Sequence, residues 1–324
     1  MRIVTIFTGG TIGSKNNGKG VISTNQEAPY QLLEHYKRVH GEDILFDTRE
    51  PYCILSENLM AKQVERLIQE VQAVIDKNQC DGIIVTHGTD TLQYTAALLG
   101  YVFETAEVPI LLVSSNFVLD DERANGMDNF AGAVKFIQEK CGNGVFVSYA
   151  NPGEEVTFHR GSKMQYSLQM SDWEYSVKNQ WYGRLVNGIF EKNAEYEERS
   201  LGGIFSPKTV TLKSQAEEIL RIRPYPGMGY PPIPDGTKAV LYEGFHSGTI
   251  PISEQLQVFC NEAREKQVPI FLSGLNEKEA EYETVGAYRK MGIIPLAGDS
   301  VIAQYCLLWL AVSNGMDVRK VMKR

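Results

Sequence analysis

Hydrophobic residues in the first half of the chain fall into short apolar runs, and these alternate with segments of helical periodicity. A short apolar run bounded by turn residues predicts a buried strand. Strands are predicted at Ile3–Phe7, Gly82–Thr86, Pro109–Val113 and Gly144–Tyr149, and helices at Ala61–Ile75, Thr91–Phe103 and Asn129–Gln138. Because the strands show no polar alternation and helices separate them, they indicate a parallel sheet covered on both faces.

The same alternation returns in the second half, after a stretch of charged and turn residues. Strands are predicted there at Glu218–Ile222, Ala239–Tyr242 and Ile270–Leu272, and helices at Glu254–Lys266 and Val301–Asn314. A chain of 324 residues is also longer than one typical domain. We therefore predict an α/β protein with two domains: a larger N-terminal parallel-sheet domain over 1–190, a linker over 191–213, and a smaller C-terminal α/β domain over 214–324.

Composition narrows the classes of partner. The formal net charge of −8 argues against general nucleic-acid binding, which needs a basic face to neutralise phosphates, and favours a small-molecule ligand. No apolar run approaches the ~18 residues needed to span a bilayer, and no secretory signal is visible, so we expect a cytoplasmic protein with no membrane partner. The five cysteines form no CxxC pair, and the histidines show no metal-ligand spacing. We expect neither a metal nor another cofactor.

Two polar segments follow predicted strands directly, Thr8–Gly13 and Thr86–Thr91. Ligands of open α/β sheets bind beyond the carboxyl ends of strands, which singles out both segments. Their glycines allow backbone to approach a ligand, and backbone amides can stabilise negative charge. A threonine hydroxyl there becomes a nucleophile if a neighbouring base or lysine takes its proton. Asp90 could bind a ligand ammonium or orient such a lysine.

Each segment also has a simpler interpretation. Glycines that precede a helix can bind phosphate, although Thr8–Gly13 has neither the GxxxxGK[ST] nor the GxGxxG pattern. In the second segment, Thr89 or Asp90 could be the N-cap of the following helix. Taken alone, the second segment favours capping.

Together the two segments closely resemble the bacterial-type L-asparaginase/glutaminase family, which has TGGTIG near its N-terminus and a DGIIVTHGTDT-like segment about seventy residues later. The resemblance covers nearly the whole chain. It continues through Ser56-Glu57-Asn58, Asp121–Ala133, Arg223–Met228 and Met291-Gly292. It implies a two-domain α/β enzyme of asparagine metabolism, a homodimer or a homotetramer built from dimers. Its sites would lie between the N-terminal domain of one subunit and the C-terminal domain of a neighbour, and its substrate would be a free amino acid.

The resemblance also implies residue roles. Thr11 would be the nucleophile that attacks the side-chain amide of asparagine, or in some members glutamine. Thr89, Asp90 and Lys163 would form a second catalytic set. The substrate's α-ammonium and α-carboxylate groups would be held by Ser56, Glu57 and Asp90, with Gly10, Gly88, Thr89 and Ser247 completing the binding set.

The chain departs from the family pattern at four places. Val21 stands where the family has a tyrosine on a mobile loop, and Tyr30 is the next tyrosine. Lys163 follows Arg160-Gly161 more closely than the family lysine does, so it could instead be a solvated surface lysine. Ser114–Asn116 replaces a T-G-[SA]-[QM] segment, and Ser247 replaces an asparagine. The alternative functions are therefore an amino-acid sensor, an inactive asparaginase fold, or a hydrolase of another small amide such as L-glutamine.

Overall fold

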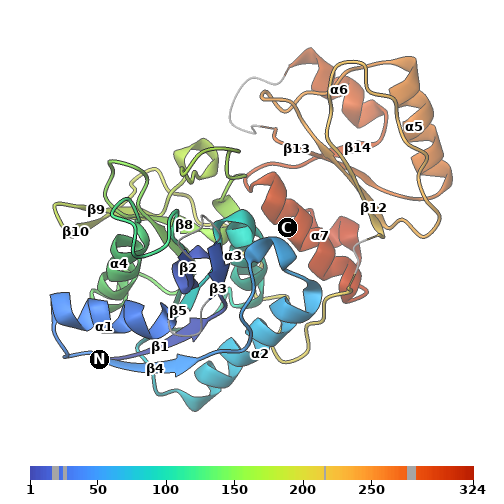
Figure 1. Ribbon diagram of the computed structural model, residues 1–324. Coiled ribbons are helices and arrows are strands. Elements are labelled where there is room, and N and C mark those ends of the chain that lie inside the picture. The colour runs from blue at the N-terminus through green and yellow to red at the C-terminus, as the bar shows by residue number, and fades with distance from the viewer. Residues whose placement is uncertain (17–21, 25–27, 215–216, 276–281) are drawn as a thin grey trace. The chain divides into compact units, whose positions relative to one another are not determined.

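The computed structural model describes residues 1–16, 22–24, 28–214, 217–275 and 282–324. The chain divides into two compact units, Met1–Val210 and Thr211–Arg324 (Figure 1). Each unit has its own sheet and its own hydrophobic core. The predicted α/β class, with a large sheet followed by a smaller one, is confirmed.

The first unit is built on an eight-stranded sheet in the order β10-β9-β8-β7-β6-β5-β1-β4. Its strands are β1 Arg2–Phe7, β4 Leu45–Arg49, β5 Gly82–Thr86, β6 Pro109–Val113, β7 Gly144–Tyr149, β8 Thr157–Arg160, β9 Gly183–Val186 and β10 Ile189–Lys192. The strands from β4 to β7 are parallel, whereas β8, β9 and β10 each pair antiparallel with the preceding strand. The sheet is therefore mixed, and the sequence prediction of a parallel sheet holds for the five strands from β7 to the edge strand β4.

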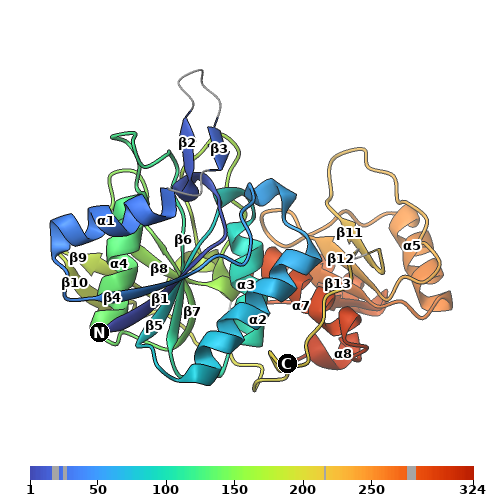
Figure 2. The same cartoon turned by 60° about the horizontal axis from the view of Figure 1, so that its bottom comes forward.

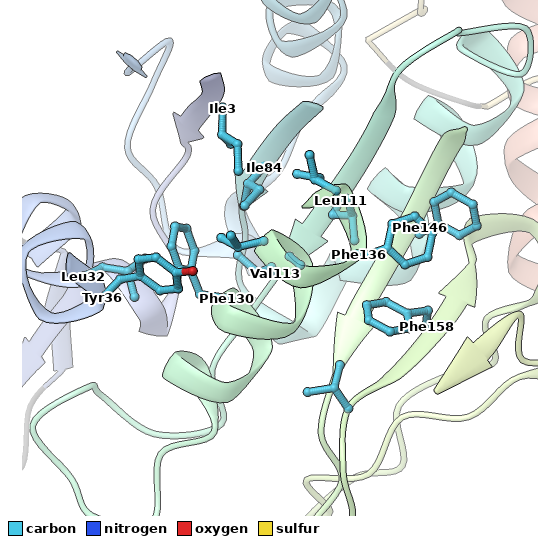
Figure 3. Close-up of a cluster of buried hydrophobic side chains, with 14 of the residues drawn as sticks. Ile3, Leu32, Tyr36, Ile84, Leu111, Val113, Phe130, Phe136, Phe146 and Phe158 are labelled. Atoms are coloured by element: carbon cyan, nitrogen blue, oxygen red, sulfur yellow. The ribbon is translucent and has the colours of Figure 1, made fainter. Parts of the chain in front are cut away.

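Helices cover both faces of this sheet, as predicted. They are α1 Ala28–His40, α2 Ala61–Lys77, α3 Leu92–Val102 and α4 Gly126–Gln138. The helices α1 and α4 lie on one face, and α2 and α3 on the other (Figure 2). Figure 3 shows the core under α1 and α4, where Leu32 and Tyr36 lie against Phe130, and Phe136 lies near Phe146 and Phe158.

The order of the strands fixes where a ligand can enter. From β1 the chain moves outward to β4, and it then returns to the opposite side of β1 to form β5, β6 and β7. The direction of winding therefore reverses between β1 and β5. In doubly wound sheets the crevice at this switch point, beyond the carboxyl ends of the strands, is the usual ligand site. The segments that follow β1 and β5 are the two glycine-rich motifs.

The second unit contains a four-stranded parallel sheet in the order β11-β12-β13-β14. Its strands are β11 Ile219–Ile222, β12 Ala239–Glu243, β13 Ile270–Ser273 and β14 Ile293–Pro295, and its helices are α5 Glu254–Glu265, α6 Glu283–Lys290, α7 Val301–Ser313 and α8 Val318–Val321. Apolar residues of α5 and α6, such as Phe259 and Tyr288, pack on β12 and β13 in one cluster.

The segment that follows the first glycine-rich motif contains regular structure. The strands β2 Ser14–Asn16 and β3 Ile22–Thr24 pair antiparallel (Figure 2). Val21, which stands where the family has its loop tyrosine, lies outside the described residues. Among the helices that the structure describes, none is long and apolar enough to cross a bilayer.

Candidate active site

The segment after β1 is held between the end of β5 and the segment that follows β4. The Thr8 hydroxyl donates to the Thr86 carbonyl at 2.6 Å, at the end of β5. On the other side, Gly9 forms a parallel bridge with Ile54, and the Gly10 amide donates to the Ile54 carbonyl at 3.0 Å. Gly9 has a φ of +102°, and a Cβ there would lie 2.2 Å from the Ile54 carbonyl oxygen. Only glycine permits this turn.

The two glycine-rich motifs touch through their backbones. A Cβ on Gly10 would lie 2.4 Å from the Gly88 nitrogen, and a Cβ on Gly88 would lie 2.4 Å from the Ser56 hydroxyl oxygen. Both distances are too short for any side chain other than hydrogen. The segments after β1, β4 and β5 therefore converge at one point, and Thr11 and Thr89 follow directly after the two glycines in contact.

Side-chain hydrogen bonds join the second motif to Ser56. The Ser56 hydroxyl donates to Asp90 Oδ2 at 3.3 Å, and the Thr91 hydroxyl donates to the Ser56 carbonyl at 2.9 Å. Ser56 is buried, Thr11 and Thr89 are partly exposed, and Glu57 and Asp90 are exposed. All of these side chains other than that of Ser56 are therefore accessible to a ligand.

The two simpler interpretations are both wrong. Thr11–Gly13 forms a single 3-10 turn that continues into β2, so no helix N-terminus follows the first motif to bind a phosphate. The N-cap of α3 is Thr91, and no side-chain cap hydrogen bond is made there. Neither Thr89 nor Asp90 is the cap residue.

The buried side chain of His87 holds the backbone of the second motif in place. It is buried, and burial lowers the pKa of its imidazole to about 4, so the ring is neutral near pH 7. The two ring nitrogens, Nδ1 and Nε2, lie 2.8 Å from the Gly88 carbonyl oxygen and from the Thr95 hydroxyl, respectively. Since a carbonyl can only accept, Nδ1 carries the proton and Nε2 accepts from Thr95. The Gly88 carbonyl is thereby held inward, which turns the Thr89 N–H of the same trans peptide away from the ring.

Lys163 lies in a 3-10 turn, Gly161–Lys163, directly after β8. It is only 4% exposed, so the interpretation as a solvated surface lysine is wrong. This turn packs closely on α3, because a Cβ on Gly161 would lie 2.1 Å from the Ala96 carbonyl oxygen. Farther along, the rings of Tyr166 and Tyr94 are 6.5 Å apart. The segment therefore runs along α3 from Ala96 back to Tyr94, toward the end where Thr89 and Asp90 lie.

The departures from the family pattern at Ser114 and Ser247 lie in different units. Ser114 follows β6 and is fully buried, and its carbonyl accepts from Asn129 Nδ2 on α4 at 2.8 Å. Ser247 belongs to the second unit, in the loop after β12, where its hydroxyl is 3.0 Å from that of Thr249. Gly244 and Gly248 bring the ends of this loop together, since a Cβ on Gly244 would lie 2.6 Å from Gly248 Cα.

Two residues at the site have roles that the sequence motifs do not indicate. Tyr52, between β4 and Ser56, is half-buried as a residue, and its hydroxyl lies beside Thr8 in a buried environment that raises the pKa of the phenol above its usual value. His87 was visible in the motif, but its supporting role depends on Thr95, one helical turn into α3. Among the described residues, no group of three or more His, Cys, Asp or Glu side chains is arranged to hold a metal ion.

Comparison with known proteins identifies the family of the chain. The family model described as "Asparaginase, N-terminal" matches residues 2–167. An L-asparaginase from Thermococcus kodakarensis is 25% identical over 335 aligned residues, covering all of this chain and 97% of that protein. A glutamyl-tRNA(Gln) amidotransferase subunit from Methanosarcina barkeri is 32% identical over 165 residues, which are 51% of this chain and 38% of that protein.

Solved structures share the fold over the full length. The crystal structure of L-asparaginase I from Vibrio cholerae has a TM-score of 0.79 at 22% identity, covering 99% of this chain and 95% of that one. The thermostable L-asparaginase from Thermococcus kodakarensis has a TM-score of 0.78 at 23% identity, covering 100% and 96%. The family match over residues 2–167 is the decisive finding. This chain belongs to the asparaginase family of amidohydrolases.

Proposed function

We propose that the chain hydrolyses the side-chain amide of L-asparagine to L-aspartate and ammonia, with Thr11 as the nucleophile. The observation that carries the proposal is the backbone contact between Gly10 and Gly88. An acyl-transfer site needs a nucleophile, a proton acceptor and oxyanion donors close together. The contact brings together the turns that supply one threonine hydroxyl each.

In the proposed reaction, Thr11 Oγ1 attacks the side-chain carbonyl carbon, and the hydroxyl proton passes to the set formed by Thr89, Asp90 and Lys163. Backbone amides around Gly88 and Thr89 stabilise the oxyanion. The C–N bond then breaks, and the leaving nitrogen takes a proton from the same set to depart as ammonia. Water attacks the resulting ester, which releases L-aspartate and returns the hydroxyl of Thr11.

Recognition of the substrate is assigned to the neighbouring carboxylates and hydroxyl. A free amino acid needs an anion for its α-ammonium group and hydrogen-bond donors for its α-carboxylate. Asp90 and Glu57 are accessible carboxylates, and the Ser56 hydroxyl lies 3.3 Å from Asp90. Ser247 belongs to the second unit. We assign the Ser247 hydroxyl to the α-ammonium group of a substrate bound in a neighbouring subunit of a homodimer or homotetramer. Light scattering of the purified protein tests this oligomeric state.

The test is ammonia release from L-asparagine and L-glutamine by the wild-type chain and by Thr11→Ala. L-Glutamine is included because several relatives are named as glutamyl-tRNA(Gln) amidotransferase subunits. We expect turnover of L-asparagine and its loss by several orders of magnitude in Thr11→Ala, since a covalent nucleophile is removed. Thr11→Ser, which keeps a hydroxyl, should retain measurable turnover.

Three results would change the proposal. Calorimetric binding of L-asparagine without ammonia release from any amide would favour the amino-acid sensor. Release from L-glutamine alone would keep the threonine mechanism and change the substrate. Near wild-type kcat in Thr11→Ala would remove Thr11 from the mechanism.

A further inference from the structure

A cavity lies in the first unit, at the antiparallel part of the sheet. Its volume is about 510 Å³. The floor comes from one face of β8 and β9, where Thr157 pairs with Arg184 and His159 is two residues farther along β8. Phe158, which alternates with them, packs on the opposite face in the core under α4. The segment Trp173–Ser176 forms the other wall.

The cavity wall contains a buried carboxyl group with half of its hydrogen-bonding capacity unused. Glu174 is 2% exposed, and its Oε1 accepts from the Ser167 hydroxyl at 2.7 Å. Its Oε2 has no hydrogen-bond partner among the described residues. The backbone of Glu174 is fixed by Asn151, whose side chain accepts from the Glu174 amide at 2.8 Å. Burial raises the pKa of this carboxyl to about 7.

His159 supplies a second unused position in the same cavity. It is also 2% exposed, its Nδ1 lies 2.8 Å from the Ser176 hydroxyl, and its Nε2 has no partner among the described residues. Burial lowers the pKa of this imidazole to about 4, so the ring is neutral near pH 7. When Nδ1 donates to Ser176, Nε2 is an acceptor. Glu174 and His159 both line the cavity, and a buried polar atom without a partner calls for an explanation such as a ligand.

The remaining side chains of the cavity favour a cation. Glu154 and Glu155 are exposed at its edge, and Arg184 is the only lysine or arginine among the residues that line it. The rings of Trp173 and Tyr175 are stacked, 6.1 Å apart at an interplanar angle of 12°. Carboxylates combined with aromatic faces are the usual surroundings of an organic ammonium group.

We propose that this cavity binds a small organic ammonium ion, which donates to Glu174 Oε2 and His159 Nε2 and lays its carbon chain against Trp173 and Tyr175. None of these residues belongs to the candidate active site. Binding of an ammonium ion in this cavity therefore does not depend on the proposed hydrolysis.

Tryptophan fluorescence can report binding directly, because two of the three tryptophans, Trp173 and Trp181, line the cavity. The third, Trp309, lies in the second unit and is removed in a Trp309→Phe background. This full-length protein is titrated with n-butylammonium, and with n-butanol as a neutral molecule of similar shape. We expect saturable quenching by n-butylammonium and no response to n-butanol. Equal responses to both, or no response to either, would overturn the proposal.

The carboxylate is tested by Glu174→Gln, with Glu155→Gln as the matched control at the cavity edge. We expect the Kd of n-butylammonium to rise at least about tenfold in Glu174→Gln, the fold-change that corresponds to losing one charge-assisted contact. Glu155→Gln should change it less than about threefold. Unchanged affinity in a folded Glu174→Gln protein, as judged by circular dichroism, would overturn the assignment.

A pH series on the unsubstituted cavity keeps the proposal testable if Glu174→Gln fails to fold. The charged and titratable groups around Glu174 are Glu154, Glu155, His159, Arg184, Tyr149 and Asp172. The pKa values of His159 and Tyr149, about 4 and about 12, lie far from neutrality. Alkylammonium ions stay protonated, as lysine does, so ionisation of Glu174 alone should make binding about tenfold tighter at pH 8 than at pH 6. Tighter binding at pH 6 would contradict the proposal.

Discussion

Three glycines decide the geometry of the candidate active site, because they have no side chain. Gly9, Gly10 and Gly88 each leave no room for a Cβ, and each contact joins two segments that follow different strands. The hydroxyl groups proposed to react depend on these contacts for their separation. Small displacements of reacting groups are costly, because about 1 Å of misplacement can reduce a rate a hundredfold.

Gly10→Ala should therefore abolish most activity without removing any proposed catalytic group. Gly10 has a φ of +78°, and the added methyl group would lie 2.4 Å from the Gly88 nitrogen, so the two turns must separate. We expect kcat/KM to fall about a hundredfold or more, and the free energy of unfolding by about 1–3 kcal/mol. Gly13→Ala is the control in the same turn, because no atom of the described residues lies within 4 Å of the position that its methyl group would take and its φ is not left-handed. Equal kinetics in the two variants would contradict this account.

Asp90→Asn should raise KM more than it lowers kcat, because it removes an anion assigned to the substrate's ammonium. The Ser56 hydroxyl donates to Asp90 Oδ2 at 3.3 Å, and an asparagine can accept this bond without the charge. We expect KM for L-asparagine to rise about tenfold or more, the change that corresponds to one lost charge-assisted contact. Steady-state kinetics measure it, and an unchanged KM would leave Asp90 without a role in binding.

At the scale of elements, the strands whose limits were predicted correctly are those that form continuous apolar runs. The limits of β5, β6 and β7 match the predicted strands, because all residues of these strands are buried. The strand β4, at the sheet edge, has a mixed sequence and is largely half-buried, so no run marked it. The strands β8 and β9 have only four residues each, and their antiparallel pairing depends on long-range contacts that no local pattern contains.

The same limit applies to individual side chains. The burial of Lys163 depends on Gly161 packing against Ala96, sixty-five positions earlier, which the sequence Arg-Gly-Ser-Lys does not indicate. Likewise, neither Glu174 nor His159 belongs to a sequence motif, and only the fold places both of them beside one cavity. Thr11, Thr89 and Asp90 could be proposed as site residues from the sequence because two motifs at strand ends contain them.

Lys163→Met tests whether the turn after β8 completes the active site. A buried lysine is rare unless its ammonium or amine has a specific partner, and the segment runs along α3 toward Thr89 and Asp90. Methionine keeps the apolar stem and removes the amine. We expect kcat to fall at least about a hundredfold, as for loss of a general base, while the melting temperature changes little. Lys62→Met, an exposed position on α2, is the control. Full activity in Lys163→Met would exclude the lysine from catalysis.

At the scale of the whole molecule, buried titratable groups of the first unit should control how stability depends on pH. Burial lowers the pKa of His87 and His159 from 6.5 to about 4, so the stability that these neutral rings contribute is present above pH 6.5 and is lost as the pH falls toward 4. Burial raises the pKa of Glu174 from 4.5 to about 7, so its contribution is present below pH 4.5 and is lost as the pH rises to 7. The two effects oppose each other between pH 4.5 and 6.5.

The balance of these three groups predicts the pH dependence and the effect of removing one of them. Between pH 6.5 and 4.5 the unfolded chain binds two more protons at the histidines and one fewer at Glu174, a net difference of one. Each proton changes the free energy of unfolding by about 1.4 kcal/mol per pH unit, so we expect a loss of about 3 kcal/mol over this range. Glu174→Gln removes the opposing term, and the loss should rise to about 6 kcal/mol. Urea unfolding followed by Trp173 and Trp181 fluorescence in a Trp309→Phe background measures both proteins. A loss of equal size in both would show that Glu174 ionises in the folded chain much as it does in the unfolded one.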